Sequence, residues 1–226
     1  MPARRTSAGQ WATRAVTVVA ALCIAGPAFT NEPSKTENAD FKRAITAVKN
    51  KDYLTALGLF EIQAKNARHD AQYNMAVLLH AGKGRPRSYT NALYWAWQAQ
   101  LGGIEAAEDL ADDILDILPP NDVDEIRKRV HDTLQARIDA KEITAIQQLA
   151  RYHTDILTEA DYVNAYIWYS IAAALNIPEA HNRRDDVEGE LTDKDLVEAQ
   201  SKTAALFDKY NFAPVSTTTK EGNNGN

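Results

Sequence analysis

An internal duplication constrains the fold of this chain more than any other feature of its sequence. Residues 88–125 match residues 161–198 at a constant shift of 73 positions, with twelve identities among the 38 aligned pairs. The shared motif Tyr-x-Asn-Ala-x-x-Trp begins at Tyr89 and again at Tyr162. Two unrelated amphipathic helices would not share so many positions through composition alone. The sequence therefore predicts a repeat protein.

A shorter period underlies the 73-residue shift, because Tyr53 and Ala56 stand 36 residues before Tyr89 and Ala92. Strand signals are absent, and the apolar residues follow helical spacing. Periods of this length are typical of stacked helical hairpins. We therefore predict an all-α solenoid of about four and a half antiparallel helical pairs. Alanines that open predicted helices recur at a similar spacing, at Ala71, Ala107, Ala145 and Ala180.

Short turns rich in glycine, proline and polar residues separate the predicted helices. Ser88 is placed to cap one helix, and the matched positions 119–121 and 192–193 are placed to open two others. The predicted helices span residues 71–82, 88–102, 104–118, 122–140, 144–153, 161–175, 179–191 and 194–210.

The N-terminus has the pattern of a secretory signal peptide. Three arginines precede an uncharged run, 15–30, that ends in small residues. Sixteen residues are short for a bilayer span, which needs about 20. We predict cleavage after Ala28 or Thr30, and an uncleaved membrane anchor is the alternative. A lipoprotein modified at Cys23 is disfavoured, because Leu22 occupies a position that requires Gly or Ala.

These patterns divide the chain into four parts: a signal peptide at 1–30, a flexible leader at 31–39, a repeat domain at 40–212 and a disordered tail at 213–226. The tail is predicted to be disordered because its Gly, Asn and Thr residues leave little apolar surface to bury. Export through the signal peptide would place the mature protein in the periplasm.

Composition excludes several classes of partner. Cys23 is the only cysteine and lies in the predicted signal peptide, so the mature chain would have neither a disulfide nor thiol chemistry. Without the three N-terminal arginines, 22 basic side chains stand against 31 acidic ones, a formal charge of −9. Such a charge repels phosphate backbones and anionic lipid surfaces. We therefore expect no nucleic acid and, after signal cleavage, no membrane as partner.

The repeated motif resembles the Sel-one-like repeat (SLR), a relative of the tetratricopeptide repeat with a longer loop in each unit. The resemblance extends from about Asp40 to Tyr210 and implies a right-handed solenoid. The second copy lacks the G-x-G loop, and TDILTEA stands in its place. The first copy matches at Ala71, Met75, Ala76, Leu79, Gly82, Gly84, Asn91, Ala92, Trp95, Ala99 and Gly102, and the second at Ala145, Leu149, Ala150, Asn164, Ala165, Trp168, Tyr169, Ala172 and Ala173.

The tryptophans of the motif admit two interpretations, a packed core or an aromatic ligand pocket. Ala92, Trp95 and Ala99 fall on one helical face, as core residues do, and this favours packing between hairpins. Trp97 is turned about 200° from Trp95 around the helix, and its counterpart in the copy is Ser170. It is expected either to pack on the next hairpin or to contact a partner.

Histidine–carboxylate neighbours are the remaining candidates for catalysis or metal binding. They are His69-Asp70, His131-Asp132 and His153 near Asp155, and they lie on separate hairpins. The sequence contains no HExxH motif, nucleophile elbow or phosphate-binding glycine loop. We predict no catalytic residue, no metal site and no cofactor.

A partner-binding surface is predicted from the resemblance, since the first helices of tetratricopeptide-type units line a concave groove. Asp109, Asp113 and Asp116 recur at i, i+4 and i+7, so they form one acidic stripe, which elsewhere is usually a solvated face. A groove with this stripe suits an extended partner with basic and apolar side chains. The residues expected to face it are Tyr73, Val77, His80, Asp109, Asp113, Asp116, Gln147, Arg151 and Thr154.

Together these features predict a non-catalytic adaptor or scaffold of the bacterial cell envelope that binds another envelope protein or peptide. The alternative is a periplasmic binder of small molecules or cell-wall fragments, or an enzyme. Self-association through the ends of the repeat array is a third possibility. We expect a monomer, because the last predicted helix carries polar residues on its outer side and can cap the array.

Overall fold

The computed structural model describes residues 35–212, and every regular element among them is helical. The predicted all-α class is therefore confirmed. The elements are α1 (Lys35–Lys49), α2 (Tyr53–Lys65), α3 (His69–Ala81), α4 (Tyr89–Leu101), α5 (Ala106–Leu115), α6 (Pro120–Asp139), α7 (Thr144–Arg151), the π-helical turn η1 (Tyr152–Ile156), α8 (Tyr162–Ala174), α9 (Ala180–Glu188) and α10 (Asp193–Tyr210).

Two of the predicted parts, the signal peptide at 1–30 and the tail at 213–226, lie outside the described residues. The predicted leader at 31–39 lies partly outside them as well. Its last five residues belong to α1, which begins at Lys35. This part of the leader prediction was wrong, because α1 begins before the apolar residues, from Phe41 onward, that pack against the core.

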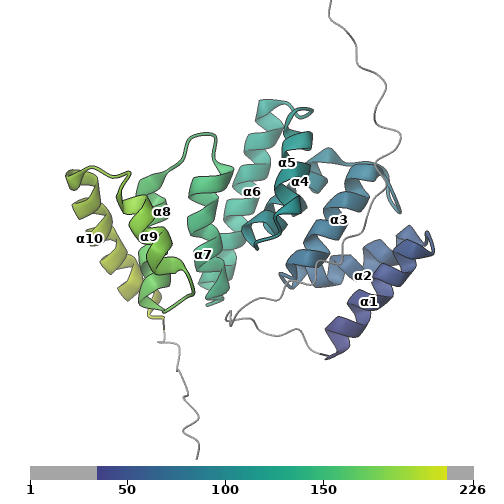
Figure 1. Ribbon diagram of the computed structural model, residues 1–226, viewed down its shortest axis with the longest axis horizontal. Coiled ribbons are helices and arrows are strands. Elements are labelled where there is room, and N and C mark those ends of the chain that lie inside the picture. Colours follow the sequence, from purple (N-terminus) through teal and green to yellow (C-terminus); the bar gives the residue numbers. More distant parts are fainter. Residues whose placement is uncertain (1–34, 213–226) are drawn as a thin grey trace, which may run out of the picture. The chain divides into compact units, whose positions relative to one another are not determined.

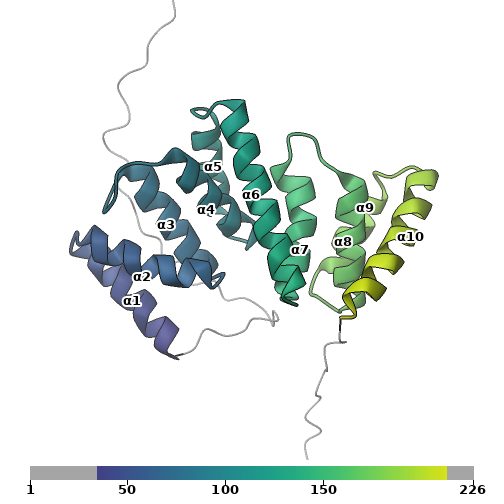
Figure 2. The ribbon, with the colours of Figure 1, turned by 180° about the vertical axis from the view of Figure 1, so that it is seen from behind.

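Each helix packs on its neighbours in the chain, as expected for stacked hairpins. In Figures 1 and 2 the helices follow one another in order from α1 to α10. The central helices of the stack are α4, which packs against α3, α5 and α6, and α8, which packs against α7, α9 and α10. The same arrangement of contacts thus occurs twice.

The 73-residue shift is preserved in the helix boundaries. Helices α4 and α8 begin 73 residues apart and end 73 residues apart, and the starts of α6 and α10 are separated by the same interval. The equivalent residues Ser88 and Asp161 both cap their helices, because their side chains accept hydrogen bonds from the backbone N–H groups of Asn91 and Asn164. Sequence alignment at this shift therefore identifies structurally equivalent positions.

The motif tryptophans lie in the core, as the facial pattern predicts. Trp95 is 8% exposed and Trp168 is 6% exposed. The alanines on the same helical faces, Ala92, Ala99, Ala165 and Ala172, are fully buried. Trp95 meets Tyr94 edge to face at 4.8 Å between ring centroids, and Trp168 lies 6.1 Å from Tyr210. Small alanines let the helices approach closely, and one large indole fills each gap between hairpins.

Two local predictions needed correction. The segment after His153 was predicted to be a loop, yet the π-helical turn η1 continues to Ile156. The carbonyl oxygen of Ile156 accepts a hydrogen bond from Nε of Arg127, which holds this turn against α6. The second correction concerns α6, where Pro119 takes the N-cap position without a side-chain hydrogen bond and Pro120 is the first helical residue. Thr192 caps α10 as predicted.

Candidate partner-binding surface

The residues predicted to face a groove come from α3, α5 and the α7–η1 segment. On α3, Tyr73, Val77 and His80 are half-buried, so each keeps part of its side chain at the surface. Gly82 ends α3 in a left-handed backbone conformation at φ 66°.

The carboxylates of α5 are all exposed. Asp109 and Asp113 lie within the helix, and Asp116 is its C-terminal cap residue. Among residues 35–212, none of these three carboxylates forms a hydrogen bond through its side chain or an ion pair with a basic side chain. Other aspartates do, as Asp124 with Arg127 at 2.8 Å and Asp155 with Arg151 at 3.1 Å show. The charge of α5 is therefore not neutralised within the fold.

The α5 carboxylates influence the titration of two α3 side chains. Burial raises the pKa of Tyr73, and the negative charge of Asp109 raises it further. Burial also lowers the pKa of His80, as does the guanidinium of Arg87, whereas Asp113 acts in the opposite direction. The charges of Asp109 and Asp113 on α5 thus act on the phenol of Tyr73 and the imidazole of His80 on α3.

The α7–η1 residues of the predicted groove form hydrogen bonds that join structural elements. Gln147 donates to the carbonyl oxygen of Pro178 at 3.2 Å. Arg151 donates to the carbonyl oxygen of Leu101 at 3.2 Å, and Thr154 donates to Asp155 at 2.6 Å. Within residues 35–212, no hydrogen bond or ion pair joins these side chains to the α5 carboxylates. The acidic surface therefore rests on α3 and α5.

Trp97 is not a surface residue. Its side chain is 2% exposed, and the guanidinium of Arg127 lies 5.7 Å from its ring centroid. This agrees with the packing alternative and corrects the prediction of a partner contact at Trp97. The physical reason is that α4 is covered on several sides by α3, α5 and α6, so a second apolar face is buried too.

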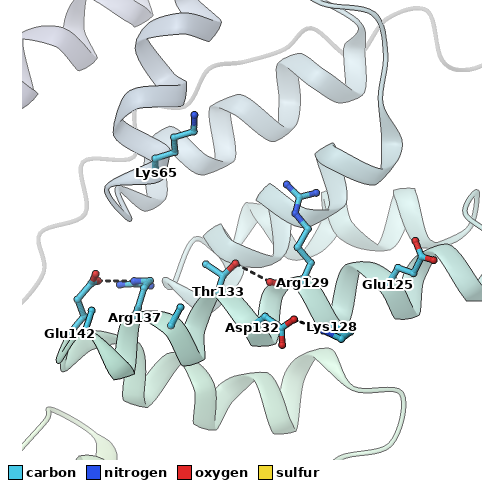
Figure 3. Close-up of a pocket in the computed structure, with 10 residues that line it drawn as sticks. Lys65, Glu125, Lys128, Arg129, Asp132, Thr133, Arg137 and Glu142 are labelled. Atoms are coloured by element: carbon cyan, nitrogen blue, oxygen red, sulfur yellow. Dashed lines mark hydrogen bonds and ion pairs between the residues drawn. The ribbon is translucent and has the colours of Figure 1, made fainter.

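A surface recess that the sequence analysis missed lies between the C-terminal end of α2, α4 and α6. Its outer part has a volume of about 640 Å³ and continues into a smaller pocket of about 190 Å³. Figure 3 shows Lys65 on α2, with its ammonium group turned away from α6, and Arg129, Thr133 and Arg137 on α6. Tyr94, Trp95 and Gln98 of α4 line the inner pocket.

The basic residues of the recess differ in whether a carboxylate pairs with them. Lys65 pairs with Glu61 at 2.9 Å, and Arg137 pairs with Glu142 at 2.7 Å. Arg129 has no carboxylate within ion-pair distance in the described part of the chain. A comparison of the two copies would have pointed to this recess, because four of its polar residues, Lys65, Gln98, Thr133 and Arg137, occupy positions that are apolar or aromatic in the second copy.

The histidine–carboxylate neighbours do not assemble into a metal site. Among residues 35–212, no group of three or more His, Cys, Asp or Glu side chains is placed to hold a metal ion. His69 bridges two glutamines, since its Nδ1 lies 2.9 Å from Oε1 of Gln72 and its Nε2 lies 3.0 Å from Nε2 of Gln148. This histidine therefore links α3 to α7.

No helix among residues 35–212 is both long and apolar enough to cross a membrane.

Comparison with known proteins gives a likeness among solved structures but no family match. No protein-family model matches the chain, and no curated protein matches it. Among solved structures, the chain is similar to a protective antigen present in uropathogenic Escherichia coli strains, described as displaying an SLR fold. The identity is 20%, the TM-score is 0.34, and the match covers 77% of this chain and 30% of that one.

The chain spans about 30% of the length of the matched protein. At 20% identity the likeness concerns the fold alone. The helical-repeat architecture is shown by the packing of α1 to α10 itself.

Proposed function

We propose that this protein is a non-catalytic scaffold that holds a segment of a partner protein along α3 and α5. The observation that carries the proposal is the unneutralised charge of α5, where Asp109, Asp113 and Asp116 are exposed and unpaired within residues 35–212. An exposed charge without an internal partner remains available to an external one.

The sequence around α5 strengthens this argument. Nine carboxylates and not one lysine or arginine lie between Arg87 and Arg127. An acidic surface of this kind attracts a segment rich in lysine or arginine and increases its association rate at low salt. Tyr73 and Val77 on the adjoining helix supply apolar contact area, since both are only half-buried. The partner segment is therefore basic with interspersed apolar side chains.

The place of action is part of the same proposal. The arginine-flanked apolar run at 15–30 supports export, and a mature chain without cysteine suits any extracytoplasmic compartment because it needs no disulfide. We assign the protein to the periplasm, where the partner would be another envelope protein or a peptide.

The test compares charge reversal on the two copies. The tagged, exported protein is purified from its own envelope after mild crosslinking, and captured proteins are identified by mass spectrometry. The variant Asp109→Arg/Asp113→Arg is expected to lose one specific protein that the wild type retains. The matched control, Asp185→Arg/Asp186→Arg, makes the same charge change on α9 and should retain it.

Reconstitution with purified components then measures the interaction directly. The captured protein should bind wild type with an affinity that falls as salt is raised, because exposed charges are screened. Equal retention of the captured protein by both double variants would contradict the proposal. A thermal-shift screen of envelope metabolites would then test the alternative of a small-molecule binder.

A further inference from the structure

The recess between α2, α4 and α6 can be compared with its counterpart in the second copy, because the 73-residue register is preserved. The equivalent positions carry different chemistry. At four lining positions an apolar or aromatic residue replaces a polar one: Ile138 stands for Lys65, Ile171 for Gln98, Leu206 for Thr133 and Tyr210 for Arg137.

In the second copy these residues fill the space. Ile138 and Ile171 are fully buried, and Tyr210 is 7% exposed. Tyr210 lies 6.1 Å from Trp168 and stacks on Phe212 at 5.3 Å between ring centroids. An apolar filling is thus compatible with this fold, and the polar lining of the first copy is not required to build the hairpins.

Arg129 is held in a position that leaves most of its donors unused. Its guanidinium lies 3.8 Å from the centroid of the Tyr94 ring, and one nitrogen donates to Oδ1 of Asn91 at 3.1 Å. Stacking fixes the planar guanidinium at low entropic cost, while its other N–H groups can still donate in pairs to a carboxylate.

The equivalent residue of the second copy, Lys202, is neutralised instead. It pairs with Glu198 at 2.7 Å, although the corresponding Glu125 is also present in the first copy. The difference follows from Tyr94, whose ring attracts Arg129, whereas the copy has Ile167 at that position. The first copy therefore maintains an unpaired cation at the edge of the recess.

Gln98 provides an independent indication of a ligand. Its side chain lines the inner pocket and is 2% exposed, and its Nε2 has no hydrogen-bond partner. A buried amide donor without a partner destabilises the fold, which Ile171 avoids at the matched position. An unpaired donor of this kind is satisfied when an acceptor oxygen enters the pocket.

From these observations we propose that the recess binds an acidic peptide segment through a side-chain carboxylate. Arg129 receives the carboxylate at the rim, and Gln98 offers an unpaired amide donor in the inner pocket, whereas Lys65 and Arg137 are already paired with Glu61 and Glu142. The site is lined by residues other than those of the α3–α5 surface and selects the opposite charge, so it is a second binding site and does not depend on the proposed function.

The dimensions and charge of the recess favour a peptide over other anions. Its lining runs along α6 from Glu125 to Ala140, about 22 Å at 1.5 Å per residue. This length accommodates about six residues of extended chain. Glu125, Asp132 and Glu142 also lie on the rim, so a densely charged polyanion such as nucleic acid is repelled, while a segment with spaced carboxylates is accepted.

Fluorescence anisotropy with a defined probe tests the proposal. The probe is a fluorescein-labelled hexapeptide of alternating alanine and glutamate, and the corresponding alanine–lysine peptide is the control. Wild type should bind the glutamate peptide only. Arg129→Glu should weaken binding at least tenfold, whereas Lys202→Glu, the same change at the equivalent position, should leave it within twofold. Succinate in excess distinguishes a peptide from a free small carboxylate as the occupant.

Three results would overturn the proposal. The first is equal weakening by Arg129→Glu and Lys202→Glu, which would show a general effect of net charge. The second is binding of succinate as tight as that of the peptide. The third is absence of peptide binding by a wild type that self-associates in sedimentation and is dissociated by Arg129→Glu, because the occupant would then be a second copy. Circular dichroism confirms that the variants are folded.

Discussion

Gly102 and His69 are in such close contact that only glycine fits at this end of α4. A Cβ on Gly102 would lie 2.0 Å from Cγ of His69 and 2.2 Å from its Nδ1. The ring cannot retreat without loss, because it is held between Gln72 and Gln148. The glycine of the repeat motif is therefore explained here by a side chain from the neighbouring helix.

Replacing Gly102 by alanine is expected to destabilise the fold by about 2–3 kcal/mol, the cost of overpacking a closed site together with strained hydrogen bonds. Urea unfolding followed by circular dichroism measures this loss. Gly58→Ala is the control, because no atom lies within 4 Å of its Cβ position in α2. It should stabilise by about 0.5–1 kcal/mol. Equal effects of the two substitutions would contradict the contact with His69.

The hydrogen bonds around His69 also define its protonation state. Gln72 Nε2 donates to the carbonyl oxygen of Ala64, so its Oε1 accepts from Nδ1–H of His69. Gln148 Oε1 accepts from Arg137, so its Nε2 donates to Nε2 of His69. The imidazole is therefore neutral, and burial lowers the pKa of His69 accordingly. Protonation would remove the acceptor for Gln148.

His153 should make the stability of the fold sensitive to acid. Burial lowers the pKa of His153 to about 4, with His131 acting in the same direction and Asp161, 3.6 Å away, opposing it. The unfolded chain therefore takes up this proton first as the pH falls. The contribution of His153 is complete above about pH 6.5 and is lost down to about pH 4, on the order of 3 kcal/mol in total.

Urea unfolding across this pH range, with His153→Phe beside wild type, isolates the effect of one group. Phenylalanine keeps a ring at this position and cannot be protonated, so the stability of the variant should decline less steeply between pH 6.5 and 4. Titratable groups that do not interact with His153 contribute equally in both proteins and cancel in the difference. Parallel curves for the two proteins would show that His153 does not stay neutral in the fold.

The helical elements were predictable from sequence because the determinants are local. Apolar spacing, caps such as Ser88 and glycine turns recur at fixed positions, and most predicted boundaries agree with the structure within a few residues. Trp95 and Trp168 were assigned to the core correctly, because a single helical face decides their burial. The acidic stripe on α5 could likewise be predicted from the helical spacing of Asp109, Asp113 and Asp116.

The features that escaped prediction depend on contacts between distant elements. Trp97 is buried by three surrounding helices, and its position on α4 alone does not reveal this. The π-helical turn after α7 is held by Arg127, 29 residues away from Ile156 in sequence. From the sequence alone Arg129 resembles any surface cation, and only the structure shows its guanidinium stacked on the ring of Tyr94. The recess is therefore formed by tertiary packing between helices, which the sequence of any one helix does not reveal.

Tyr210 should be the main anchor of the last helix. Its ring packs near Trp168 and stacks on Phe212, and its hydroxyl donates to Asp139 at 3.1 Å while accepting from Gln135 at 2.6 Å. Tyr210→Ala is expected to cost about 3–5 kcal/mol through the cavity it leaves. Tyr210→Phe should cost about 1 kcal/mol through the lost hydrogen bonds. Calorimetry on both variants tests the order, and a larger loss for phenylalanine would refute the packing role.

Gln98→Ile is expected to stabilise the fold, which is an uncommon outcome for a core substitution. It replaces an unpaired buried amide by the residue that the second copy carries at the matched position, Ile171, where it is fully buried. Removing the unsatisfied donor should add about 1–2 kcal/mol to the free energy of unfolding, measured in urea. The same variant should bind the glutamate hexapeptide several-fold less tightly than wild type. A gain in stability together with a loss of binding is the pattern of a residue kept for a ligand at the expense of the fold. If the variant is destabilised instead, Gln98 contributes packing or hydrogen bonding to the native core, and its role as a donor to a ligand is refuted.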